Sequence, residues 1–349
     1  MTSTTTVFRR RHVFAAAVLG TLAACGTSTG GYWKLPNGTK SQYREAEALV
    51  KQGQYEAALP TFRSFADQGY PQAQYELGRA YLKGWGVEQD KTKAAEYFEK
   101  ATLKLSRRRG HAAFQLGRLY ADGDGVPRDP ARAAELFRLA LDMNKTVVPY
   151  DRAAYPLAEL YENGEGVERD LDKARELYVK AAQRGNPHAH LRLAHMAAEG
   201  QGGPALDADH HAREAVRLYE VRAAQGESWA MTKLARIYED GKVVPVSKDK
   251  ALAWRERAAK AGHLQSRTAY GRRLTEGDGV PKDPARGIAM IRESAEAGHG
   301  YAQSLLGRAY AKGTGVGRDP AQAFKWHELA ARQGQVGSTL YVARAYRDG

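Results

Sequence analysis

The sequence predicts an all-α protein: a right-handed α/α solenoid of about eight helix-turn-helix repeats, preceded by an export signal and a tether. Three observations predict this. A unit of 36 residues recurs through most of the chain, helical patterning flanks a glycine-rich turn in each unit, and the chain begins with a basic and then an apolar segment. The predicted divisions are a signal peptide over 1–24, a tether over 25–41 and a repeat solenoid over 42–349.

The composition limits the class of protein. Of the 349 residues, 43% are hydrophobic and 27% are charged, as in soluble folded proteins, and the mean hydropathy is -0.59. These values exclude a polytopic membrane protein. No run after residue 25 is long and apolar enough to cross a bilayer.

The first residues have the pattern of an export signal. A basic stretch, Arg9–Arg11, precedes an apolar stretch over 13–22, which is too short for a transmembrane helix and typical of a signal-peptide core. It ends in Leu22-Ala23-Ala24-Cys25, which resembles a bacterial lipobox. That resemblance implies that Cys25 is acylated and becomes the first residue of the mature chain, where each buried CH2 contributes about 0.8 kcal/mol of membrane affinity.

Cys25 is also the only cysteine, which excludes an intrachain disulfide and a cysteine-based metal site. An incidental cysteine after an ordinary cleaved signal is the alternative to lipidation. Gly26 follows it, with no aspartate there, and resemblance to sorted lipoproteins favours the periplasmic face of the outer membrane. The stretch from Thr27 to Ser41 is rich in Gly, Ser, Thr and Pro, as expected of a tether.

The repeat is most regular at a turn of the form Gly-x-Gly-Val. Its first glycine stands at 277 and again at 313, 36 residues on. Glycine enters positive φ without steric cost, so the turn is predicted to end one helix and lead to the next. The turn glycines predicted to be structural are Gly84, Gly86, Gly123, Gly125, Gly164, Gly166, Gly277, Gly279, Gly313 and Gly315.

The second helix of each unit has a strong start signal. An aspartate follows the first turn glycine by six residues, and in three copies proline comes next, as for an N-cap followed by proline in the first helical turn. The predicted caps are Asp90, Asp129, Asp170, Asp283 and Asp319. In the first helix, a Gly or Ala at positions such as 78, 117 and 307 is predicted to let the neighbouring helix approach closely. Insertions near 103–110, 145–152 and 201–211 are predicted to lie between helices.

This pattern resembles the Sel-one-like repeat, a relative of the tetratricopeptide repeat with a longer, glycine-bearing turn. The resemblance covers residues 71–349, while 42–70 has the shorter tetratricopeptide-type turn at Gly53. It implies a superhelix with an extended concave face that holds protein partners. One copy departs from the pattern, because Val243 replaces the second glycine and Ser247 the capping aspartate.

Nothing in the sequence forms a catalytic set, so no enzyme activity, cofactor or metal is predicted. The glycine turns follow helices, lack Gly-Lys-Ser/Thr and recur throughout, unlike a nucleotide loop. Five histidines fall between 188 and 211, but His188 and His195 share a face, His190 points elsewhere, and His210 and His211 are predicted to lie in an inserted loop. A metal-dependent hydrolase is therefore only a remote alternative.

Charge and aromatic residues suggest where partners bind. The formal charge is +13, and removal of 1–24 takes away three arginines and no acids, leaving +10. A positive exported protein suits an acidic polysaccharide or lipid headgroups, whereas nucleic acid is implausible. The predicted partner- or polyanion-binding residues are Arg107, Arg108, Arg109, Trp85 and Trp229; Trp254 and Trp326 are predicted to pack in the core.

A lipobox joined to this solenoid resembles the AlgK-like family of outer-membrane lipoproteins. That resemblance implies a membrane-anchored periplasmic scaffold for alginate-type exopolysaccharide secretion, whose partners are an outer-membrane porin and periplasmic secretion components. A periplasmic regulatory adaptor that binds a sensor, and a peptidoglycan- or cell-division-associated scaffold, remain alternatives. The sequence ends in a half-repeat at Gly349, whose uncovered helix face predicts a docking site or a truncated chain.

Overall fold

The computed structural model describes residues 39–142, 150–201 and 206–348, and these ranges contain helices and turns but no strand. Cys25 and nearly all of the predicted tether lie outside the described residues. None of the described helices is both long enough and apolar enough to span a membrane.

Seventeen α-helices follow one another in the described residues. They are α1 (Lys40–Lys51), α2 (Tyr55–Asp67), α3 (Pro71–Lys83), α4 (Lys91–Thr102), α5 (Arg109–Asp122), α6 (Pro130–Leu141), α7 (Ala154–Asn163), α8 (Leu171–Gln183), α9 (Pro187–Ala198), α10 (Ala208–Ala224), α11 (Ser228–Asp240), α12 (Lys248–Lys260), α13 (Leu264–Glu276), α14 (Pro284–Glu296), α15 (Gly300–Lys312), α16 (Pro320–Arg332) and α17 (Val336–Asp348). A 3-10 turn, Asp151–Ala153, leads into α7.

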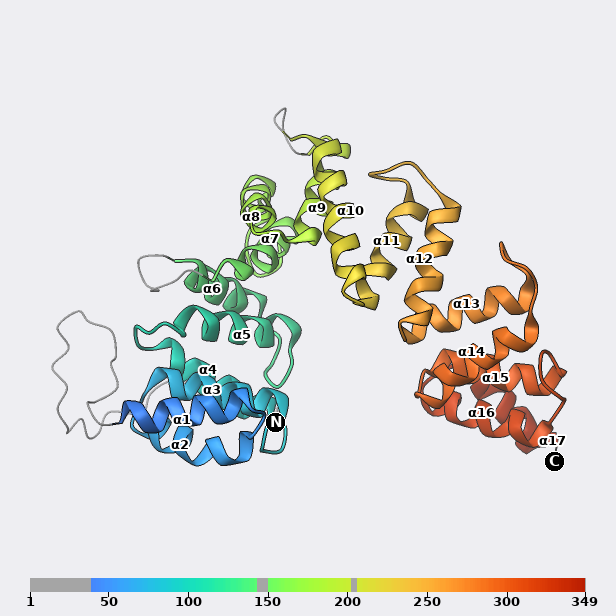
Figure 1. Cartoon of the computed structure of the whole chain (residues 1–349), viewed down its shortest axis with the longest axis horizontal. Coiled ribbons are helices and arrows are strands. Elements are labelled where there is room, and N and C mark those ends of the chain that lie inside the picture. Colours follow the sequence, from blue (N-terminus) through green and yellow to red (C-terminus); the bar gives the residue numbers. More distant parts are fainter. Residues whose placement is uncertain (1–38, 143–149, 202–205, 349) are drawn as a thin grey trace, which may run out of the picture.

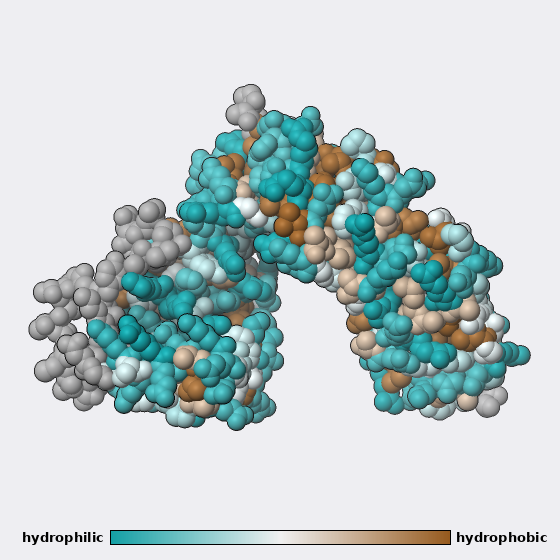
Figure 2. Space-filling model, in the orientation of Figure 1, coloured by the Kyte–Doolittle hydropathy of each residue, from teal (hydrophilic) through white to brown (hydrophobic). Residues whose placement is uncertain are grey.

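The helices pack in consecutive pairs, and the pairs stack into an arch (Figure 1). Helices α1 to α6 form one limb, α9 and α10 stand near the top, and α13 to α17 form the other limb. Figure 2 shows the hollow that the two limbs enclose. The predicted all-helical solenoid is confirmed: eight pairs run from α1 to α16, and α17 takes the place of a first helix.

The turns that carry the repeating aspartate are fastened to both of their helices. At the Asp129 turn, the backbone N–H of Asp129 donates to the carbonyl of Tyr120 in α5 at 2.8 Å. Its carboxylate accepts from the backbone N–H of Arg132 in α6 at 2.9 Å, so one residue joins the two helices. The other aspartates at this position make the same two bonds: Asp90, Asp170, Asp283 and Asp319.

In four of the five Gly-x-Gly turns, the second glycine lies directly on the preceding repeat: Gly86, Gly125, Gly166 and Gly315. Gly166 has φ of 68°, and a Cβ there would stand 2.2 Å from the backbone N of Ala131 and 2.4 Å from the carbonyl carbon of Pro130. The turn between α7 and α8 therefore rests on the first residues of α6. Gly279 also has positive φ, 71°, but its nearest neighbour would be Nη1 of Arg273 at 3.9 Å. Glycine is thus required at Gly166 for both conformation and space.

Within a pair, a glycine of the first helix faces a large side chain of the second. A Cβ at Gly117 would stand 2.7 Å from Cε1 of Phe137, which is fully buried. Phe98 meets Gly78 in the same way, and His327 takes the aromatic position opposite Gly307. These contacts show the close approach of the paired helices that the small residues of the first helices predicted.

The prediction for His210 and His211 was wrong. Both lie in the first turn of α10, because Asp207 caps the helix by accepting from the backbone N–H of His210 at 2.9 Å. The third insertion therefore lengthens α10 to 17 residues instead of forming loop throughout. The altered turn near Val243 still caps α12, since Ser247 Oγ accepts from the backbone N–H of Lys250 at 3.4 Å.

Candidate functional site

Helices α9 and α11 are the first helices of two successive repeats. The face that they share has a hollow at each end. Both hollows take residues from regular positions on these helices. Trp229, Lys233, Arg236 and Asp240 follow one another at i, i+4, i+7 and i+11, which places them on one side of α11. We call this surface the α9–α11 face.

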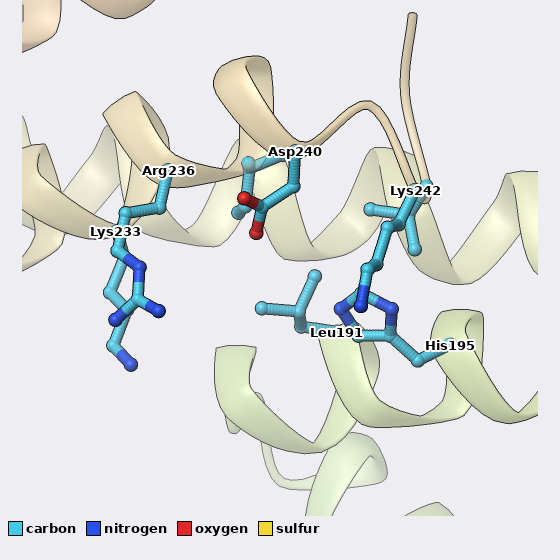
Figure 3. Close-up of a pocket in the computed structure, with 8 residues that line it drawn as sticks. Leu191, His195, Lys233, Arg236, Asp240 and Lys242 are labelled. Carbon is cyan, nitrogen blue, oxygen red and sulfur yellow. The ribbon is translucent and has the colours of Figure 1, made fainter. Parts of the chain in front are cut away.

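The first hollow, which we call the basic pocket, has a volume of about 160 Å³. Figure 3 shows Lys233, Arg236 and Asp240 on α11, Lys242 in the turn that follows α11, and His195 on α9. The remaining lining side chains are apolar: Leu191, Ile237 and Val243. Three cationic side chains thus surround an apolar surface with one carboxylate among them.

The cations of the basic pocket outnumber its single carboxylate, that of Asp240. Within the described ranges, Lys233, Arg236 and Lys242 form no ion pair. Burial lowers the pKa of the His195 imidazole, and the charges of Arg192 and Lys242 lower it further, so His195 is neutral near pH 7. Burial raises the pKa of Glu159 on α7, and the charge of Lys233 opposes that rise without a direct contact. The pocket therefore keeps a positive field available to an anion.

The second hollow, which we call the aromatic hollow, is more open and has a volume of about 540 Å³. Trp229 remains 38% exposed and stacks on His188 at a centroid distance of 5.4 Å. Tyr219 holds this arrangement from α10, because its hydroxyl lies 2.8 Å from Nδ1 of His188. Burial lowers the pKa of His188 to about 4, with a further contribution from Lys233. A neutral, fixed imidazole therefore supports the indole.

Three arginines lie around the aromatic hollow: Arg152, Arg184 and Arg222. Nε of Arg184 is 2.9 Å from Asp151, and Nη1 of Arg222 is 3.4 Å from Glu227. Arg152 is exposed and makes no ion pair in the described part of the chain. Arg152 is thus the one arginine around this hollow whose charge no ion pair offsets in the described residues.

The other predicted binding residues lie elsewhere. Trp85 stacks on Tyr55 of α2 at 4.8 Å, and the Arg79 guanidinium lies 4.9 Å above its ring. Trp85 therefore joins the N-terminal helix pair to the first glycine turn, far along the chain from Trp229. Trp254 and Trp326 pack against the core, as predicted.

The three arginines at 107–109 differ in their surroundings. Two of them make contacts within the fold, and one is exposed. Nε of Arg109 donates to the carbonyl of Thr102 at 2.8 Å, which ties α5 to the end of α4. Arg108 lies 3.5 Å from Glu76 and over the ring of Tyr75. Arg107 is the exposed member of the run.

Sequence reasoning missed Lys233, Arg236 and Lys242. They stand apart in the sequence and form no run, so no local density of charge marks them. The available signal was the helical spacing of Lys233 and Arg236 from Trp229, which the repeat register places on one face.

Two of the clustered histidines meet between α9 and α10. Nδ1 of His190 lies 3.0 Å from Nδ1 of His211, and Nε2 of His190 lies 3.2 Å from the carbonyl of Ala182. A carbonyl only accepts, so Nε2 carries the proton and Nδ1 of His190 accepts from His211. Across the described residues, no group of three or more His, Cys, Asp or Glu side chains is arranged to hold a metal ion.

Comparison with protein families identifies the repeat. The Sel1 repeat model matches seven segments, at residues 71–104, 110–145, 151–186, 187–226, 230–263, 265–299 and 300–335. Together these cover well over half of the chain and leave out α1 and α2, where the sequence predicts a tetratricopeptide-type turn. Comparison with curated proteins found no match.

A solved structure of a Sel1 repeat protein agrees with this assignment. The chain is similar to a Sel1 repeat protein from Oxalobacter formigenes, with 27% identity over 88% of each chain and a TM-score of 0.58. It also matches a protective antigen with an SLR fold from uropathogenic Escherichia coli, with 25% identity over 89% of this chain and 72% of that one and a TM-score of 0.48. The Sel1 helical solenoid is a scaffold fold for protein–protein interaction and is typically non-catalytic. This chain belongs to the Sel1 repeat family.

Proposed function

We propose that this protein is a lipid-anchored scaffold at the periplasmic face of the outer membrane, where it assembles an exopolysaccharide secretion complex of the alginate type. The observation that carries the proposal is the lipobox-like cysteine, Cys25, ahead of seven Sel1 repeats. The lipid holds the solenoid at a membrane, and the solenoid offers a long surface to protein partners. The expected partners are an outer-membrane porin and periplasmic components of the same complex.

The geometry of the arch supports a scaffold role. The aspartate-capped turns are fastened to their own helices, and most of them rest on the preceding repeat, so the stack is held in shape without a ligand. A preorganised surface binds with a smaller entropic loss than a flexible one. Stacked repeats also present several successive faces, which suits simultaneous contact with more than one partner.

The anchor can be tested by labelling cells with a palmitate analogue and separating their inner and outer membranes. We expect the wild-type chain to be labelled and recovered with the outer membrane, and Cys25→Ser to be unlabelled and released. Gly26→Asp is the matched control, because it keeps the cysteine and alters the sorting position. It is expected to remain labelled and to move to the inner membrane. An unlabelled wild-type chain would contradict the proposal.

The secretion role has its own test. Deletion of the gene in its native host is expected to reduce secreted acidic polysaccharide while its synthesis continues, and wild-type protein is expected to restore export. Cys25→Ser should fail to restore it. Unchanged export, together with an altered output of an envelope sensor, would favour the regulatory adaptor instead.

A further inference from the structure

From the chemistry of the two hollows on the α9–α11 face, we infer that this face binds a short acidic segment of a protein partner, with an apolar side chain of that segment entering the basic pocket. The inference rests on the proposed scaffold function and names the kind of segment that the scaffold receives. Its test is independent of the lipid anchor, so the two can fail separately.

The cations of the basic pocket differ from many other charges of the solenoid in forming no ion pair within the described ranges. Many charges on this solenoid are neutralised by neighbours, as in the ion pairs of Arg192 with Glu162 and of Arg255 with Glu239. Lys233, Arg236 and Lys242 surround one pocket that has a single carboxylate, Asp240, and in the described ranges they form no ion pair. Like charges held around one hollow repel each other, and a carboxylate placed there relieves that repulsion. The pocket therefore selects an anion.

An apolar lining lies beneath those cations. Leu191, Ile237 and Val243 line the basic pocket; Ile237 is almost completely buried, so the half-buried Leu191 and Val243 provide most of the apolar surface that remains in contact with water. An apolar side chain that entered the pocket would remove this surface from water, while neighbouring carboxylates reached the cations at the rim. A polypeptide provides apolar and acidic side chains side by side. A polyuronate provides carboxylates but no apolar side chain.

The two hollows are poor in amide and hydroxyl side chains. Among the lining residues of the two hollows, Asn186 is the only amide or hydroxyl side chain. Its Oδ1 already accepts from the backbone N–H groups of His188 and Ala189 at 2.9 and 3.2 Å. A sugar polymer brings a hydroxyl group at almost every carbon, and each loses its hydration on binding. The charged side chains suit the carboxylates of either ligand, so it is the apolar lining of the basic pocket that favours an acidic protein segment over an acidic polysaccharide.

The aromatic hollow provides a second contact at a fixed spacing. Trp229 precedes Arg236 by seven residues on one side of α11, which is about 10 Å along the helix axis. An extended segment advances about 3.3 Å per residue, so about three residues of the partner separate the two contacts. One face of Trp229 is held by His188, and its exposed surface is flanked by the arginines of the second hollow. The expected segment has apolar or aromatic anchors about three residues apart among Asp and Glu.

The test is selection from a display library of random peptides of about twelve residues on the full chain purified in detergent. We expect the wild-type chain to enrich acidic peptides that carry two apolar or aromatic residues about three positions apart. Lys233→Glu/Arg236→Glu should lose that enrichment, and its affinity for the best wild-type peptide should fall at least tenfold. Raised salt should weaken the wild-type complex.

The matched control is Arg318→Glu/Lys325→Glu, which makes the same change in net charge at two exposed residues of a distant repeat. This variant should enrich the same peptides and bind them within about twofold of wild type. Circular dichroism and thermal melting should show that both double variants remain folded.

Three results would overturn the inference: no enrichment of acidic peptides, equal loss in both double variants, or unchanged binding when the apolar anchors are replaced by serine. Polygalacturonate is the competing probe. If it binds the wild-type chain more tightly than the selected peptides and depends on Lys233 and Arg236, the face receives an acidic polysaccharide instead. Peptide binding by a chain that fails the lipid-labelling test would leave this inference standing and remove the proposed location.

Discussion

Replacement of Gly166 by alanine is expected to lower the free energy of unfolding by about 3 kcal/mol. Alanine in the left-handed conformation costs about 1 kcal/mol. The new methyl group would also stand 2.2 Å from the backbone N of Ala131. Backbone must move to admit it, and overpacking of this kind costs about 2 kcal/mol more. The contact between the α7–α8 turn and α6 should therefore open first.

Gly279→Ala is the control for this prediction, because Gly279 has nearly the same φ but open space around its Cβ position. It should lose only the conformational part, about 1 kcal/mol. Urea denaturation followed by circular dichroism measures both values. Since each repeat contacts only its neighbours, Gly166→Ala should also broaden or divide the transition. Equal losses in the two variants would show that the close contact at Gly166 contributes no stability.

Acidification is expected to destabilise the C-terminal repeats through His327. Its ring is 2% exposed, and Nδ1 lies 2.9 Å from Oγ of Ser338. Ser338 donates its own hydroxyl to Ser304, so Nδ1 of His327 carries the proton and donates to Ser338. Burial lowers the pKa of this imidazole to about 4, and the charge of Arg308 adds to the shift.

The sign of the effect follows from the two states. An unfolded histidine has a pKa of about 6.5, so above that pH both states are neutral and the stability is complete. As the pH falls from about 6.5 towards 4, the unfolded chain binds a proton that the folded chain rejects, and stability is lost. We expect a loss of about 2 kcal/mol from this group at a pH of about 4.5.

Hydrogen exchange of α16 and α17 measures this loss locally. The variant His327→Phe has phenylalanine at the position that Phe98 and Phe137 occupy in earlier repeats, where each faces a glycine of the paired helix. It also removes the titratable imidazole. The variant should show a shallower dependence of exchange on pH than wild type, after correction for intrinsic exchange. Its stability at neutral pH should fall by about 1 kcal/mol, because Ser338 loses the imidazole donor. An unchanged pH dependence in the variant would assign the acid sensitivity to other groups.

Much of the fold could be predicted because its signals are local. The turn glycines and the capping aspartates mark helix ends within a few residues, and they recur often enough to set the register of the stack. The start of α10 was missed because the insertion after α9 interrupts that register. Asp207 acts there as a cap, outside the repeating position of the other aspartates. The N–H group of His210 is bonded to it, and so the helix includes both histidines.

The binding face was harder to predict because adjacent residues of a helix point in different directions. Successive residues turn by about 100°, so a run such as 107–109 spreads around the axis, and two of its members are used inside the fold. The cations of the basic pocket come from one face of α11 and from the following turn, and α9 lines the other side. Trp229 was predicted as a binding residue, and the structure places it on the same face as Lys233 and Arg236.

We infer that a membrane-held solenoid receives its partner through the α9–α11 face. Photo-crosslinking in living cells tests it most directly, with a photoreactive amino acid at Arg236 and, as the control, at Lys325. We predict that position 236 crosslinks to one envelope protein through an acidic segment, that position 325 does not, and that Cys25→Ser abolishes the adduct. The same adducts from both positions, or an adduct from position 236 that persists in Cys25→Ser, would contradict the claim.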